Sequence, residues 1–118
     1  MLYTNLKHIE TASDYTKAIE NNKNVVIICG RMDISCIPIF NIVEEFESKY
    51  KKVKFYDMEL DNPESDVLKN VVEYYDIQNM PLIGYFRNGN LIEVSLGCQT
   101  KQQMSIVLNK VFGATVNV

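Results

Sequence analysis

A thiol and a carboxylate stand three residues apart, directly behind a continuous apolar run. The run is Val25–Cys29, and the polar segment after it carries Asp33 and Cys36. A β-branched run of this kind predicts a strand that is buried on both faces. Helical spacing begins after Cys36, with Asp33 or Ser35 as the expected N-cap, and the dipole at a helix N-terminus favours a thiolate. The sequence therefore predicts a strand-to-helix junction with one cysteine, where two would make a redox centre.

The composition excludes several classes of function. The 118 residues are 47% hydrophobic and 23% charged, with a net charge of −3, which predicts one globular domain over residues 1–118. The sequence has no basic patch of the kind that binds nucleic acid. Its apolar runs are all shorter than the roughly 18 residues of a membrane span. The opening residues, Met1–Asn5, turn polar too soon for a signal peptide. Because the 3 cysteines are a sparse, odd set that suits a reducing cytosol, we expect a cytoplasmic protein without nucleic-acid or membrane partners.

Two other groups of polar residues were candidates for metal binding. His8 is the only histidine and has no cysteine beside it, which favours a surface or strand residue over a metal ligand or catalytic base. Asp57, Glu59 and Asp61 alternate with apolar residues and could offer three carboxylates on one strand face. Without a loop of the calcium-binding type, we interpret them as a solvated edge face. We therefore expect no metal and no cofactor.

Hydrophobic periodicity predicts strands and helices in alternation. The predicted strands are residues 7–9, 25–29, 53–61, 82–86 and 91–96. The helical stripes expected to face the core are Tyr15, Ala18 and Ile19; Ile39, Ile42, Val43, Phe46 and Tyr50; Val67, Leu68, Val71, Val72 and Tyr75; and Met104, Val107, Leu108 and Val111. Each stripe recurs at the three- and four-residue spacing of a helix face. Residues 114–118 are expected to form a frayed tail.

Turn and cap signals define the order of these elements. Asn88–Gly89 predicts a type I′ hairpin between the last two strands, and capping boxes are expected at Thr11–Asp14 and Thr100–Gln103. Helical crossovers demand parallel strands, whereas the hairpin demands an antiparallel pair. The order β-α-β-α-β-α-β-β-α therefore predicts an α/β fold in which four helices flank a central mixed five-stranded sheet.

This order, with Met80–Pro81 before the hairpin and Asn88–Gly89 within it, resembles the thioredoxin family from Lys7 to Phe112. Further motifs in register are the strand ending near Cys29, Cys36 at a helix start, Glu44–Glu45, Asp61–Pro63 and Gly97. The resemblance implies a thioredoxin fold with a cis proline at Pro81. Such a proline turns the backbone of Met80 toward a substrate chain, which can pair with it like an added strand.

The departures from the family pattern bear on activity. Thioredoxins carry Cys-x-x-Cys, in which the first thiolate attacks a disulfide and the second resolves the mixed disulfide. The matching segment here places Asp33 at the nucleophile's position and Cys36 at the resolving one. By the same comparison, Met32 replaces an aromatic residue and Ile27 replaces a buried proton-handling aspartate. A carboxylate close to Cys36 is also expected to disfavour its thiolate.

These departures favour a protein-binding or adaptor module with a degenerate active site and no dithiol reductase activity. The predicted contact surface comprises Met32, Asp33, Ile34, Ser35 and Cys36, together with Met80, Pro81, Gly97 and Cys98. The alternative is an atypical or monothiol thiol-disulfide oxidoreductase that uses Cys36. A Cys36–Cys98 or Cys29–Cys36 pair could rebuild a disulfide centre, whereas the simpler interpretation makes Cys29 a small buried residue and Cys98 a loop thiol. The oligomeric state is left open.

Overall fold

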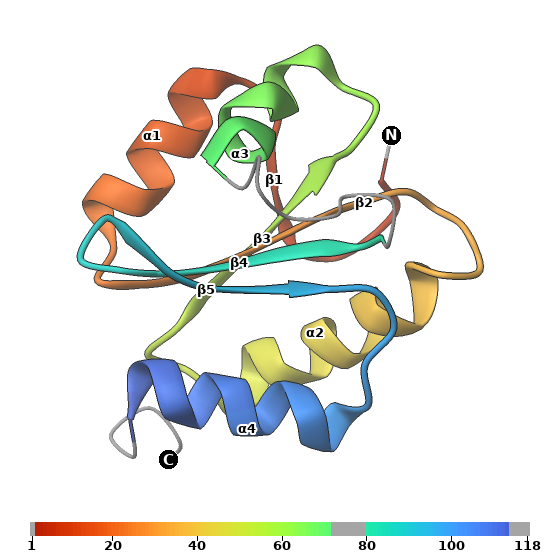
Figure 1. Ribbon diagram of the computed structural model, residues 1–118, viewed down its shortest axis with the longest axis vertical. Helices are drawn as coiled ribbons and strands as arrows, with labels where there is room; N and C mark the ends of the chain where they lie inside the picture. Colours follow the sequence, from red (N-terminus) through yellow and green to blue (C-terminus); the bar gives the residue numbers. More distant parts are fainter. Residues whose placement is uncertain (1, 72–79, 114–118) are drawn as a thin grey trace.

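A five-stranded mixed sheet forms the centre of the computed structural model, which describes residues 2–71 and 80–113 (Figure 1). The strands are β1 (Lys7–Ile9), β2 (Asn24–Gly30), β3 (Lys54–Glu59), β4 (Leu82–Arg87) and β5 (Asn90–Leu96), in the spatial order β1-β3-β2-β4-β5. β3 pairs in parallel with β1 and β2, whereas β4 pairs antiparallel with β2 and β5. The predicted mixed sheet and the order of its elements are confirmed.

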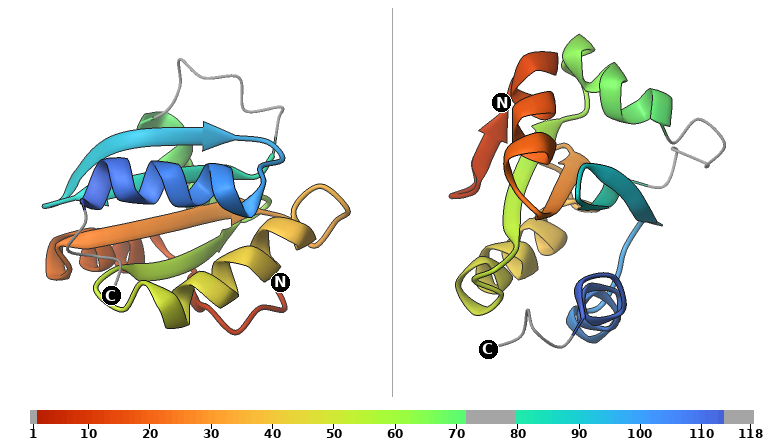
Figure 2. Two further views of the ribbon diagram at one scale, coloured as in Figure 1. Left: turned by 90° about the horizontal axis from the view of Figure 1, so that it is seen from below. Right: turned by 90° about the vertical axis from the view of Figure 1, so that its left-hand side faces the viewer.

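Two layers of helices enclose this sheet. Helices α1 (Ala12–Asn21) and α3 (Asp66–Val71) cover one face, and α2 (Ile37–Lys49) and α4 (Lys101–Phe112) cover the other (Figure 2, right). A 3-10 turn at Pro63–Ser65, capped by the side chain of Asn62, leads into α3. None of the helices in the described ranges is long and apolar enough to cross a membrane.

The central strand is buried on both faces, as predicted. Every residue from Val25 to Cys29 is fully buried, because β3 and β4 flank this strand while helices cover both of its faces. The ring of Tyr15 from α1 meets that of Phe86 from β4 edge to face at 5.9 Å between centroids. Sheet and helix layers therefore share one apolar core that holds the end of β2 in place.

Local signals account for the connections. Both predicted capping boxes are confirmed, at Thr11–Asp14 and at Thr100–Gln103. Asn88 and Gly89 have φ angles of 54° and 81°, the left-handed values that a type I′ turn requires at both central positions. The expectations for Val72, Tyr75 and residues 114–118 lie outside the described residues.

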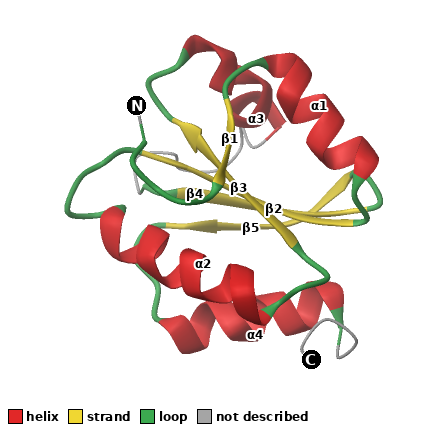
Figure 3. Cartoon of the chain, turned by 180° about the vertical axis from the view of Figure 1, so that it is seen from behind, coloured by secondary structure: helices red, strands yellow, loops and turns green. Residues whose placement is uncertain are grey.

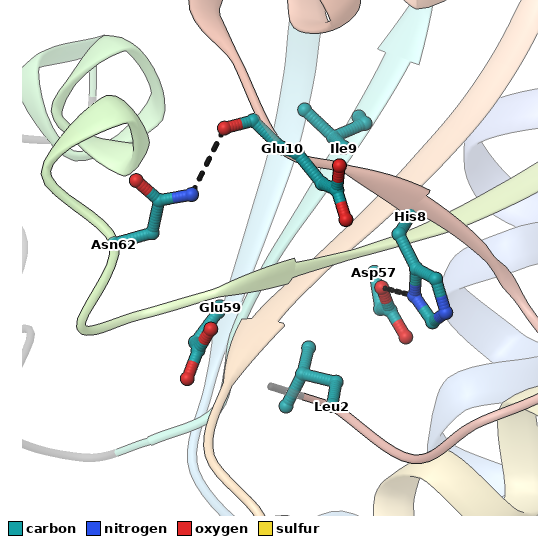
Figure 4. A pocket seen from close by; sticks show the side chains of 7 residues that line it. All are labelled: Leu2, His8, Ile9, Glu10, Asp57, Glu59 and Asn62. Carbon is teal, nitrogen blue, oxygen red and sulfur yellow. Dashed lines mark hydrogen bonds and ion pairs between the residues drawn. The ribbon is translucent and has the colours of Figure 1, made fainter.

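Asp57 corrects the prediction of a solvated edge face. Its side chain on β3 is only 1% exposed, because β1 and the segment before it cover this side of the strand. The buried carboxylate accepts hydrogen bonds from the hydroxyl of Thr4 and from Nδ1 of His8, which lies 2.6 Å from Oδ1 (Figure 4). Asp61 does lie at the surface, where it pairs with Arg31. The alternating acidic residues along this strand therefore do not form a single solvent-exposed face.

The environment of Asp57 predicts a pH dependence of stability. Burial raises the pKa of Asp57, although the hydrogen bonds from Thr4 and His8 oppose the rise. A carboxyl group that holds its proton more tightly in the folded state stabilises the fold at acidic pH, and this contribution is lost as the pH rises through the folded-state pKa. We therefore expect the free energy of unfolding of the wild type, relative to Asp57→Asn, to fall as the pH rises above about 4.

Urea unfolding of both proteins at a series of pH values measures this difference. The matched control is Asp66→Asn, which removes a carboxylate that is 66% exposed. A pH profile of Asp57→Asn that runs parallel to that of the wild type would contradict the prediction.

Candidate functional site

The segment between β2 and α2 is a tight turn held by Asp33. Oδ1 of Asp33 accepts hydrogen bonds from the amide of Cys36 at 2.9 Å and from the hydroxyl of Ser35 at 2.8 Å, and its carbonyl accepts the amide of Ile37 at 2.9 Å. The prediction that Asp33 or Ser35 caps α2 itself is wrong by one turn, because α2 begins at Ile37 after Cys36. Asp33 instead caps the turn that leads into the helix. Figure 3 shows this loop projecting at one edge of the sheet.

The Asp33 carboxylate is ionised at neutral pH. Hydrogen bonds from the Ser35 hydroxyl and then from Cys36 lower the pKa of Asp33, because they stabilise the charged form. Both of these hydrogen bonds end on Oδ1, and none of the described residues donates to Oδ2. The turn thus presents a negative charge whose second oxygen accepts no hydrogen bond from the described residues.

Cys36 is fully buried beneath this turn. A Cβ atom built on Gly30 would lie 2.9 Å from Sγ of Cys36 and 3.3 Å from Cβ of Pro81, so the thiol is packed against the backbone at the end of β2. Burial raises the pKa of the Cys36 thiol, and the neighbouring Asp33 carboxylate raises it further, while bonds from Arg31 and Ser35 act in the opposite direction. The thiol is therefore shielded and not activated.

The Met80–Pro81 and Gly97–Cys98 segments converge on the same turn. The peptide bond between Met80 and Pro81 is cis, and the carbonyl of Pro81 accepts the amide of Gly97 at 3.1 Å. Sγ of Cys98 lies 3.8 Å from the carbonyl oxygen of Ser35. Together these segments border an open groove of about 580 Å³, whose lining residues are Arg31, Asp33, Ser35, Met80, Leu96, Gly97 and Cys98.

Four predicted surface residues do not line the groove: Met32, Ile34, Cys36 and Pro81. Ile34, at the tip of the turn, is 93% exposed. Sδ of Met32 accepts a hydrogen bond from the amide of Tyr3 at 3.4 Å, which places the N-terminal segment beside the turn. Sequence reasoning did not include Tyr3, because no local pattern connects it to a loop 29 residues away.

Arg31 is a second residue that sequence reasoning missed. Its guanidinium forms bidentate hydrogen bonds of 3.0–3.1 Å with Asp61. This pair lines a second groove, which also includes Met80 and Lys69. A signal was available in the sequence. Arg31 follows β2 and Asp61 follows β3, and the carboxyl ends of parallel strands meet at the same edge of a sheet.

All 3 cysteines are free thiols in this structure, and no disulfide joins Cys36 to Cys98 or to Cys29. Burial raises the pKa of Cys29 to about 12, which identifies it as a packed apolar residue. Cys98 is exposed in the loop after β5. Within residues 2–71 and 80–113, the structure shows no group of three or more histidine, cysteine or acidic side chains that could hold a metal ion.

A separate cavity of about 300 Å³ lies at the ends of β1 and β3. Its lining residues are Leu2, His8, Ile9, Glu10, Asp57, Glu59 and Asn62 (Figure 4). The amide of Asn62 donates to the carbonyl of Glu10 at 2.9 Å, and the His8–Asp57 pair closes one side. These bonds fasten the start of the chain to β3, so we assign this cavity a structural role.

The fold and site together define an α/β protein with a thiol at a strand-to-helix junction, facing a cis proline. No family model matches the chain, and no curated protein matches its sequence. Among similar solved structures, the oxidised thioredoxin of Plasmodium falciparum aligns with a TM-score of 0.75 at 22% identity, covering 92% of this chain and 99% of its own.

Other thioredoxins align equally well. That of Malassezia sympodialis has a TM-score of 0.75 at 19% identity, with 94% of each chain covered. Oxidised mitochondrial thioredoxin 3 of Saccharomyces cerevisiae has a TM-score of 0.75 at 17% identity, covering 89% of this chain and 94% of its own. The protein therefore has the thioredoxin fold, as predicted. At these identities the likeness concerns the fold alone.

The burial of the thiols predicts their order of reaction. We expect iodoacetamide to alkylate Cys98 rapidly in the native protein, and Cys29 and Cys36 only after unfolding, because both are buried with raised pKa values. Peptide mass mapping over time gives a rate for each thiol. Cys98→Ser is the control that removes the fast reaction. The prediction is wrong if Cys36 of the native protein reacts as fast as Cys98.

Proposed function

We propose that this protein is a protein-binding or adaptor module that has lost dithiol chemistry. Its docking surface is formed by the exposed groups of three segments, residues 32–36, 80–81 and 97–98, while Cys36 itself lies beneath that surface. The observation that carries the proposal is the turn itself, in which an ionised carboxylate replaces the attacking sulfur and the remaining thiol is buried beneath it. An aspartate cannot form a mixed disulfide, so a protein with Asp33 at this position cannot carry out the first step of the thioredoxin cycle.

The exposed apolar residue supports a binding role. Ile34 is 93% exposed at the tip of the turn, and covering such a side chain contributes about 2 kcal/mol to association. The adjoining groove is lined by Met80, so an extended segment bound there could add to the chain beside Met80 as a strand adds to a sheet edge. These features favour a protein partner over a small molecule.

A second candidate function is an atypical or monothiol oxidoreductase. Cys98 supports it, because its exposed thiol lies 3.8 Å from the carbonyl of Ser35, next to Cys36 in the chain. Such an enzyme would form a mixed disulfide at one of these two cysteines and resolve it with the other or with a small thiol. Three free cysteines also accord with the reducing cytosol that we propose as its compartment.

Catalysed reduction of insulin by dithiothreitol tests the loss of dithiol chemistry. We expect the wild type to give the uncatalysed rate, because Cys36 has no partner at the nucleophile's position. Asp33→Cys rebuilds Cys-x-x-Cys on the same turn and is expected to accelerate the reaction. The double variant Asp33→Cys/Cys36→Ser is its control. Robust turnover by the wild type would overturn the proposal.

Partner capture under two redox conditions separates the two candidate functions. An adaptor is expected to retain the same partners with and without reductant, and equally in Cys36→Ser. Ile34→Ala should weaken the retained complexes by about tenfold, because it removes buried apolar area. Partners that disappear with reductant, and with Cys36→Ser, would instead favour the oxidoreductase.

A further inference from the structure

The open oxygen of Asp33 indicates what kind of partner the docking surface fits. Oδ1 is occupied by Ser35 and Cys36, whereas none of the described residues donates to Oδ2. Because the bonds to Oδ1 already hold the turn, Oδ2 is free to accept a further hydrogen bond without loss of structure. A charged acceptor strongly favours a charged donor.

The cations around the groove are already paired. Arg31 directs its guanidinium to Asp61 through two parallel hydrogen bonds, and Lys101 pairs with Glu45 on α2. Lys69, which lines the second groove, lies 3.2 Å from Asp66. The negative charge of Asp33 therefore has no ion-pair partner among the described residues, in a chain whose net charge is −3.

Apolar side chains frame this charge. Ile34 stands exposed directly beside Asp33, and Met80 and Leu96 line the groove that Asp33 shares. A partner that covers these side chains would exclude water around Oδ2, and exclusion of water strengthens a charge-assisted hydrogen bond while penalising an unpaired carboxylate. An uncharged or acidic partner would leave that carboxylate desolvated and unmatched.

We propose that the partner of the docking surface is an extended peptide segment with a basic side chain that pairs with Oδ2 of Asp33 and an adjacent apolar side chain that covers Ile34. This inference rests on the proposed binding function. In it, an ion pair stands where thioredoxins form their mixed disulfide. Recognition is reversible and depends on salt concentration.

Selection from a random heptapeptide phage library, with the native protein as bait at low ionic strength, identifies the preferred chemistry. We expect the selected peptides to combine lysine or arginine with a neighbouring apolar residue, and to lose binding to Ile34→Ala. Neutral or acidic peptides that depend on Ile34 would uphold the docking function and overturn this inference. A selection with no dependence on Ile34 would count against both.

A double-mutant cycle then tests the pair directly. The best selected peptide is compared with a version carrying glutamine at its basic position, each against the wild type and Asp33→Asn. Asparagine keeps an Oδ1 acceptor for the turn, removes the negative charge and places an NH2 donor where Oδ2 was. We expect Asp33→Asn to lower the affinity for the basic peptide by about five- to tenfold, and to change the affinity for the glutamine peptide hardly at all.

The control is Asp66→Asn, which removes an exposed carboxylate on α3. It should leave the affinity of both peptides unchanged. Equal losses for the two peptides on Asp33→Asn would show that Asp33 acts only through the shape of the turn, and would overturn the inference.

Discussion

The capped turn at Asp33 is the interaction on which the site depends. One carboxylate oxygen holds both the amide of Cys36 and the hydroxyl of Ser35, and this fixes the direction in which the chain enters α2. The same group adds a charge that disfavours the Cys36 thiolate, and it accepts the hydrogen bond of an amide that could otherwise stabilise a thiolate. One side chain therefore holds the turn and also adds to the rise in the pKa of the thiol beneath it.

The burial of Cys36 also disfavours its thiolate. Gly30 has no side chain, and this lets Sγ of Cys36 sit where a Cβ atom would come within 2.9 Å. Pro81 closes the same space from the neighbouring strand, and its carbonyl ties the Gly97 loop into the arrangement. The thiol is thus a packing element of the junction. What reaches solvent is the polar and apolar surface around it, in particular Ile34, Asp33 and Cys98.

Much of the fold could be predicted from the sequence, because its signals are local. Helical stripes, two capping boxes and the Asn88–Gly89 turn each depend on residues close together in the chain, and the strand order then follows from connection rules. Asp57 could not be predicted in this way. Its burial depends on β1, a strand of 3 residues, and on Thr4, which lies 53 residues away. The contact of Tyr3 with Met32 is likewise tertiary, and no local pattern indicates it. The Arg31–Asp61 pair is tertiary too, but the positions of both residues at the carboxyl ends of parallel strands could have indicated it.

Asp57 and Asp33 show that the same type of side chain can have opposite roles in one protein. Asp57 is enclosed on β3, where burial raises its pKa and its donors Thr4 and His8 hold the start of the chain. Asp33 stands at the surface, where hydrogen bonds from its own turn lower its pKa and keep it charged. Because a charge held at the surface by local bonds costs little to maintain, it is available to another molecule. In the proposed binding function, this fixed negative charge would select partners by electrostatic complementarity.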